Sequence, residues 1–199
     1  MARSSEATRH NILSCAIDHA AKVGLSGLTI GGLAEATHLS KSGLFAHFGS
    51  KEALQVSVIE AASERFVEEV VRPALKAPRG EPRVVQLFER WLSWALQQSA
   101  GCILTAASFE LDDQPGPARE ALVKSERDWL DTLAQAARIA QREGHFRADL
   151  DPEDFAFDLH GLMLSTHTAA RLVRDPSAYD RAKRSFSRLL AASRTSPTP

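Results

Sequence analysis

The side chains that could support catalysis or bind a metal ion are few and scattered. Cys15 and Cys102 are the two cysteines, too few and too far apart for a disulfide framework or a zinc site built on thiolates. Asp112 and Asp113 form a carboxylate pair, but the prolines and glycine that follow indicate a solvated turn. The segment 43–51 lacks the glycine spacing of a phosphate-binding loop, and the common hydrolase, metalloprotease and dithiol motifs do not occur. We therefore expect no enzymatic activity, no cofactor and no metal site.

A second group of residues has the chemistry of a nucleic-acid contact. Serine, lysine and histidine recur between residues 40 and 51. Residues 1–51 hold five Lys and Arg against three Asp and Glu, a net charge of +2, so the chain's total of −1 leaves −3 for the remainder. A mildly basic segment on an acidic body favours a polyanion as the partner of that segment alone.

These residues need elements to position them, and the sequence predicts helices almost throughout. Of the 199 residues, 44% are hydrophobic, which excludes a chain disordered along its whole length. No stretch is apolar enough for a membrane span, the N-terminus does not resemble a signal peptide, and two cysteines fit a cytoplasmic protein. Apolar residues recur at helical period, without the alternation of a half-buried strand. We predict an all-α fold of about nine helices, with a three-helix head (1–50), a helical body (51–194) and a disordered tail (195–199).

The head contains two short predicted helices behind a longer one. Thr29 and Ser40 are at N-cap positions, and residues 37–39 separate the two short helices. Leu44 and Phe48 share one face of the second short helix, and burying them turns the opposite face outward. That face can approach base edges in a DNA major groove, so a helix-turn-helix is predicted. Its residues are small or polar: Lys41, Ser42, Gly43, Ala46 and His47.

The head resembles the DNA-binding domain of TetR-type transcriptional regulators. The likeness covers residues 8–54 and is most specific in the run L-S-K-S-G-L-F-A-H-F-G-S-K-E-A-L at 39–54, which follows T-I-x-x-L-A-E-A at 29–36. It implies that residues 40–48 form the recognition helix of a homodimer that binds a palindromic double-stranded operator. It also implies a helical body that binds a small-molecule effector, and the family's habit favours repression.

Carried over residue by residue, the resemblance defines a DNA-binding set. Bases would be faced by Lys41, Ser42, Gly43 and Ala46, and the phosphate backbone by Thr29, Phe45, His47 and Lys51, with Ser40 at the helix start. Phe45 departs from the family's usual tyrosine and loses a hydroxyl bond to phosphate. His38 departs from the usual glycine, so we predict a left-handed backbone there. Leu39 is expected to fill the angle between the two short helices.

The body would supply the dimer interface and the effector pocket. Apolar stripes on the last two helices suit a two-fold four-helix packing, although a plain core would have the same pattern. The predicted interface residues are Leu159, Met163, Thr166, Ala170, Phe186 and Leu190. Aromatic residues of the middle helices suit a cavity for a lipophilic molecule, although they equally suit an ordinary core. The predicted pocket residues are Phe88, Trp91, Leu92, Cys102, Phe109, Trp129, His160 and His167.

One other class of function stays open beside a regulator. A helical module that binds proteins or small molecules, with a head that does not bind DNA, would have the same helical pattern. The small basic excess and Phe45 leave that alternative in place. A steep fall of duplex affinity with salt concentration would distinguish a DNA-binding protein from such a module.

Overall fold

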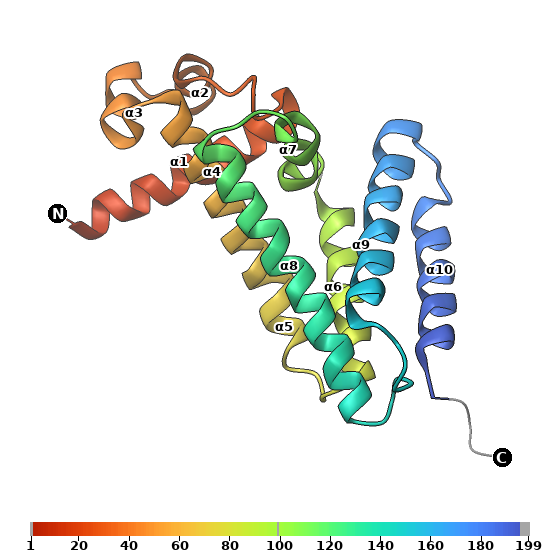
Figure 1. The fold of residues 1–199 in the computed structure, drawn as a ribbon. Coiled ribbons are helices and arrows are strands. Elements are labelled where there is room, and N and C mark those ends of the chain that lie inside the picture. Colours follow the sequence, from red (N-terminus) through yellow and green to blue (C-terminus); the bar gives the residue numbers. More distant parts are fainter. Residues whose placement is uncertain (1, 99, 196–199) are drawn as a thin grey trace. The chain divides into compact units, whose positions relative to one another are not determined.

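The computed structural model describes the backbone of residues 2–98 and 100–195, and side chains from residue 8 onward. Within these ranges there is no strand, one isolated β-bridge joins Phe146 and Arg194, and the predicted all-α fold is confirmed. No helix within them is both long and apolar enough to span a lipid bilayer. The nine helices of eight or more residues are α1 (Ala2–Val23), α2 (Ile30–Thr37), α3 (Lys41–Phe48), α4 (Lys51–Phe66), α6 (Glu81–Gln97), α7 (Ile103–Leu111), α8 (Pro117–Arg142), α9 (Pro152–Thr168) and α10 (Ala178–Ser193) (Figure 1). Shorter pieces are α5 (Arg72–Ala74) and the π-helical segments η1 (Val67–Val71) and η2 (Ala169–Val173).

The helices form two compact units. Unit 1 takes residues up to Phe66 together with 98–125, and unit 2 takes residues 67–97 and those from Glu126 onward. Unit 1 is larger than the predicted head, because α4, α7 and the start of α8 pack into the same core. Of the predicted tail, Thr195 is described and ordered, since its backbone N–H donates to the His145 carbonyl at 3.2 Å. Residues 196–199 lie outside the described residues.

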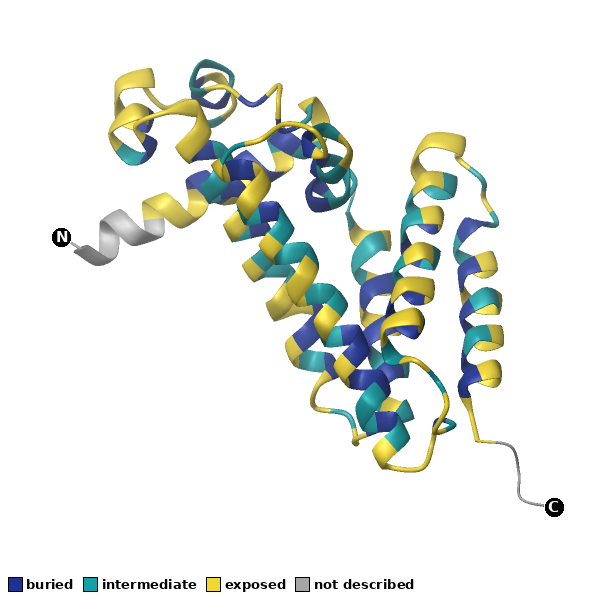
Figure 2. Ribbon diagram, viewed as in Figure 1, coloured by how far each residue is buried: buried dark blue, intermediate teal, exposed yellow. Residues whose placement is uncertain are grey.

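Unit 1 is built around the apolar stripe of α1. Ala16 and Ala20 on α1 are fully buried, and their small side chains allow α2 and α4 to approach α1 closely. Leu33 and Leu44 bring α2 and α3 onto the same core. Figure 2 shows these buried residues on the inner sides of the helices, while most of α3 is exposed. The core therefore fixes which side of α3 faces solvent.

Hydroxyl side chains begin both short helices, as predicted. Thr29 Oγ1 accepts a hydrogen bond from the Gly32 N–H at 3.0 Å at the start of α2. Ser40 Oγ accepts one from the Gly43 N–H at 3.1 Å at the start of α3. Each cap satisfies a backbone donor that the first turn of a helix leaves without a partner.

The turn between α2 and α3 depends on a left-handed residue. His38 has φ 56° and ψ 28°, which confirms the predicted conformation, and the Leu39 N–H donates to the Ala34 carbonyl at 3.1 Å. This pattern ends a helix and reverses the chain within two residues. The expectation that Leu39 fills the angle between the helices is wrong, because its side chain is 41% exposed. The backbone bonds of the turn, and not an apolar plug, set the angle.

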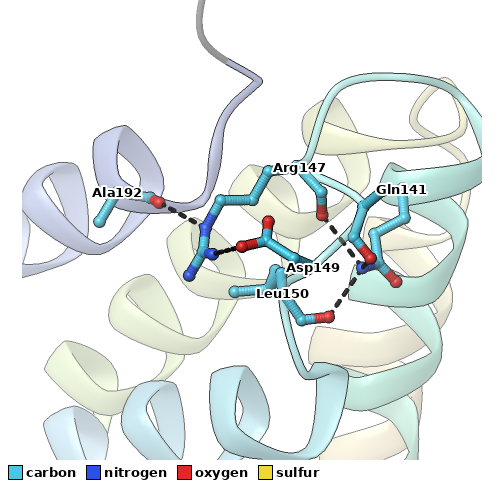
Figure 3. A network of polar contacts seen from close by, with 6 residues as sticks. Gln141, Arg147, Asp149, Leu150 and Ala192 are labelled. Carbon is cyan, nitrogen blue, oxygen red and sulfur yellow. Dashed lines mark hydrogen bonds and ion pairs between the residues drawn. The ribbon is translucent and has the colours of Figure 1, made fainter.

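In unit 2, polar contacts tie the α8–α9 loop to the end of α10 (Figure 3). Gln141 Nε2 donates to the carbonyls of Arg147 and Leu150 at 3.1 and 2.8 Å. Arg147 in turn donates from Nε to the Ala192 carbonyl at 3.2 Å and forms an ion pair with Asp149 at 2.7 Å. These bonds anchor the loop to α8 and to the end of α10 without regular secondary structure.

The left-handed conformation of His38 gives a test of the turn. A β-branched residue is strained at positive φ, whereas glycine is not, so His38→Val should lower the free energy of unfolding by about 1–2 kcal/mol relative to His38→Gly. Urea unfolding followed by circular dichroism measures the difference. Equal unfolding midpoints for the two variants would contradict the left-handed assignment.

Candidate nucleic-acid interface

The recognition-helix candidate α3 has a buried side and a bare side. Leu44 and Phe48 are buried, and the opposite side presents Ser42, Gly43 and Ala46 to solvent. These three residues are small and exposed, so another molecule can approach the helix backbone closely. Small side chains of this kind suit an approach to base edges in a DNA major groove. The predicted outward face is therefore present in the structure, and we call it the α3 face.

Longer side chains flank the α3 face. The Phe45 ring is 58% exposed and lies on one flank, and His47 is half-buried on the other. Lys41 is exposed, and its chain runs close to the start of α2, because a Cβ added at Gly31 would lie 3.5 Å from Lys41 Cε and 4.0 Å from Thr29 Oγ1. Thr29, Lys41 and the two helix starts are thus brought together. Hydroxyls, an ammonium and capped helix N-termini are groups that bind phosphate.

One of the two glycines of α2, Gly32, has a packing reason. Gly31 and Gly32 each cost a helix about 1 kcal/mol relative to alanine. A Cβ at Gly32 would lie 3.2 Å from Thr29 Oγ1 and 3.4 Å from His19 Nε2, closer than ordinary contact. The missing side chain therefore leaves room for the Thr29 cap, and α2 is formed over its full length despite the two glycines.

Arg9 supports α3 from behind and was missed by sequence reasoning. Its guanidinium carbon lies 5.8 Å from the centre of the Phe48 ring, a cation–π distance, and its Nη2 donates to Ser57 Oγ at 3.2 Å. One side chain of α1 thus touches both α3 and α4. The spacing of Arg9 within the predicted motif was visible, but nothing in the sequence indicated that its partner is the ring of Phe48.

Lys51 has a partner inside the protein. Its Nζ donates to the Ser26 carbonyl at 2.7 Å, so the ammonium is held at the α1–α2 turn. The prediction that Lys51 lies along a phosphate backbone stays a prediction, and the ammonium keeps two further protons for such a contact.

The residues predicted for a dimer interface need correction. Leu159, Met163, Thr166, Phe186 and Leu190 are all buried within the single chain, and Ala170 is half-buried. These five side chains lie in the interior of the single chain, where Phe186 stacks on Phe88 of α6, so they are not available to a partner. A helix side buried within one chain and a dimer interface have the same helical period, and the sequence pattern does not distinguish them.

Some of the residues predicted for an effector pocket are buried, and one is exposed. Phe88 is buried and stacks on Phe186 with ring centres 3.9 Å apart, and Trp91 and Leu92 are also buried. Phe109 is 65% exposed, so it does not line an enclosed cavity within unit 1. Unit 2 has a surface groove of about 1120 Å³ at the start of α6, and none of the eight predicted residues lines it. The lining residues are Pro73, Lys76, Ala77, Pro78, Glu81, Pro82, Val85, Gln86, Glu89, Arg90 and His145.

Two of the predicted pocket histidines lie in surroundings of low polarity. His160 Nε2 is 3.5 Å from Glu126 Oε2 in unit 2. Burial lowers the pKa of His160 below its ordinary 6.5 and raises the pKa of Glu126 above its ordinary 4.5. Burial and the charge of Arg171 lower the pKa of His167. All three shifts disfavour charge, so the pair at 3.5 Å is not held together chiefly by ionic attraction.

Comparison with known proteins places both parts of the chain in one family. A family model described as bacterial regulatory proteins of the tetR family matches residues 12–58, and one described as the tetracyclin repressor-like C-terminal domain matches residues 80–186, more than half of the chain. The transcriptional regulator AcuR of Cereibacter sphaeroides is 23% identical over 149 residues, which cover 73% of this chain and 68% of AcuR.

Solved structures share the fold. A TetR transcriptional regulator from Chloroflexus aurantiacus superposes with a TM-score of 0.84 at 21% identity, covering 95% of each chain. A transcriptional regulator from Saccharomonospora viridis, solved in complex with choline, superposes with a TM-score of 0.77 at 22% identity, covering 97% of this chain and 100% of that one.

The pKa shifts predict how stability depends on pH. Because His160 and His167 bind protons more weakly in the folded state, the unfolded state takes up more protons below about pH 6.5, and stability falls on acidification. The variant His160→Gln/His167→Gln should lose less stability than the wild type between about pH 7 and pH 5 in urea unfolding. Glu126→Gln should lose more, because protonation of the raised carboxyl group favours the folded state as pH falls. Parallel profiles for all three proteins would contradict the shifts.

Proposed function

We propose that this chain, which belongs to the TetR family of bacterial regulatory proteins, is a cytoplasmic repressor that binds a palindromic operator as a homodimer and is released by a lipophilic small molecule. The family consists of transcriptional regulators that bind DNA and are not enzymes, and the chain is accordingly a DNA-binding transcriptional regulator. The observation that carries the proposal is the α3 face, a bare surface with phosphate-binding groups on its flanks.

We assign base contacts to the centre of the α3 face and phosphate contacts to its flanks. Ser42 and Ala46 are exposed, and small side chains allow the helix to sit deep in a groove. Phe45 keeps an exposed ring but has no hydroxyl, so it offers apolar contact to a thymine methyl or a sugar instead of a hydrogen bond. Thr29, Ser40 and Lys41 supply the polar contacts around the rim. Lys51 and His47 complete the set we propose.

Two copies of α3 are needed, because one helix reads only a few base pairs. A two-fold dimer presents both copies to successive major grooves about 34–36 Å apart. We propose the solvent side of α9 as the contact between copies, because it carries an apolar residue that the single chain leaves bare: Phe157 is 76% exposed. Gly161 and Ser165 follow on the same side and are small enough for close helix approach. Leu172, seven residues beyond Ser165 in η2, is exposed as well.

The proposed effector site is in unit 2. Trp129 and His160 are half-buried there, and burial lowers the pKa of His160 and raises the pKa of Glu126. An environment that disfavours charge favours a ligand with a large apolar part and few polar groups. The family model that matches residues 80–186 is described as tetracyclin repressor-like, and this supports repression as the mode of regulation. The effector would release the operator by favouring the conformation that does not bind DNA.

Operator binding can be tested by selecting duplexes from a random pool. The wild type should enrich a palindrome, with affinity that falls steeply as salt rises. Ala46→Glu places a carboxylate at the centre of the α3 face in both copies, so operator affinity should fall at least about 100-fold with unchanged helicity. The matched control is Ala148→Glu, the same change at an exposed loop position of unit 2, which should bind as the wild type does. Failure to enrich any duplex would contradict the proposal.

Dimerisation can be tested at Phe157. Phe157→Asp adds a charge to a side chain that is exposed in the single chain, so the fold should persist while the dimer weakens at least about tenfold in sedimentation equilibrium. Leu75→Asp, which changes another exposed apolar residue of unit 2, is the matched control. A variant that dimerises as tightly as the wild type would exclude this side of α9 as the contact.

A further inference from the structure

Glu110 holds the turn between α1 and α2 from a helix outside the helix-turn-helix. It lies near the end of α7, whose apolar side is buried in the core of unit 1. Glu110 Oε1 accepts a hydrogen bond from the Leu25 N–H at 3.0 Å, and Oε2 accepts one from the Ser26 N–H at 2.7 Å. A hydrogen bond to a carboxylate is about twice as strong as one between two neutral groups, and Glu110 accepts two of them.

Helix α4 holds the same two residues from their carbonyl side. Gln55 Nε2 donates to the Leu25 carbonyl at 2.8 Å, and Lys51 Nζ donates to the Ser26 carbonyl at 2.7 Å. Each backbone N–H and C=O of Leu25 and Ser26 is therefore bonded to a side chain of α7 or α4. We call this arrangement of Glu110, Gln55 and Lys51 around Leu25 and Ser26 the turn clamp.

The turn clamp determines where α2 begins. Leu25 is fully buried, and its carbonyl also accepts the Leu28 N–H at 3.2 Å, just before the Thr29 cap. Helix α2 packs in turn on α3. A shift of α7 would therefore move the start of α2 and, through α2, the α3 face.

The Glu110 carboxylate lies directly over Gly24. Gly24 has φ +81°, and a Cβ there would lie 2.9 Å from Glu110 Oε1. Any side chain would be strained by the backbone angle and would also press on the carboxylate. The glycine thus ends α1 and leaves room for Glu110.

We propose that Glu110 is a positioning residue, which orients the α3 face so that two copies can engage two half-sites at once. The inference rests on the proposed function, because it requires an operator with two half-sites. Helix α7 follows α6 of unit 2 directly in sequence, so Glu110 joins the segment arriving from unit 2 to the DNA-binding surface.

The test compares a full operator with a half-site. The full duplex is the palindrome enriched by the wild type, and the half-site duplex has one arm scrambled. Glu110→Ala and Glu110→Gln should lower affinity for the full operator at least about tenfold and leave affinity for the half-site unchanged. Each head stays folded, but the two α3 faces no longer have the spacing that fits two half-sites. Asp113→Ala, an exposed carboxylate just beyond α7, is the matched control and should behave as the wild type.

Backbone amide exchange gives a second measurement on the same proteins. Exchange at Leu25 and Ser26 should accelerate at least about tenfold in Glu110→Gln, which also serves if Glu110→Ala does not fold. An unchanged ratio of full-operator to half-site affinity would overturn the inference, and so would an equal loss on both duplexes, which indicates a damaged head. A wild type that binds neither duplex contradicts the proposed function instead.

Discussion

The structure depends on burying one side of an eight-residue helix while its other side stays bare. A helix as short as α3 is not stable alone in water, because its nucleation cost exceeds what two turns of hydrogen bonds recover. Leu44 and Phe48 supply the burial, and the Ser40 cap satisfies a donor at the exposed start. The helices of unit 1 that share a core with these two side chains, which include α1, α2, α4 and α7, therefore also determine where the α3 face points.

The parts of the fold that could be predicted from sequence are those with a local physical cause. The caps at Thr29 and Ser40 follow from the residue itself and its next three or four neighbours, and the structure confirms them. The left-handed His38 is predicted because it stands where the TetR-type turn usually has glycine, and the structure confirms it too. The α3 face follows from helical period alone. The prediction that Leu39 fills the angle between α2 and α3 is wrong, because that angle depends on tertiary packing and one apolar side chain in a turn does not reveal it.

The parts that could not be predicted depend on which surfaces meet. An apolar stripe shows that a helix side is buried but not against what, so the pattern that predicts a partner copy at Leu159 and Phe186 equally fits side chains buried within one chain, where Phe186 stacks on Phe88. Phe157 lies outside the stripe, and only the structure shows that its side chain is exposed. Glu110 and its partners at Leu25 and Ser26 are 85 and 84 residues apart, and no spacing rule connects them.

These contacts explain how such a protein can be regulated without hiding its DNA-binding surface. The α3 face is exposed in the structure, so covering it would require another part of the protein to move over it. Two half-sites bound together gain about 10²–10⁴ in affinity over one, and that gain disappears when geometry forbids both contacts at once. Under the proposed function, a small displacement of the turn clamp would change the spacing between the two α3 faces and leave the chemistry of each face unchanged. Regulation that changes only the spacing of the two α3 faces would need a few kcal/mol of differential binding by an effector. Regulation by unfolding a head would need the head's full free energy of unfolding.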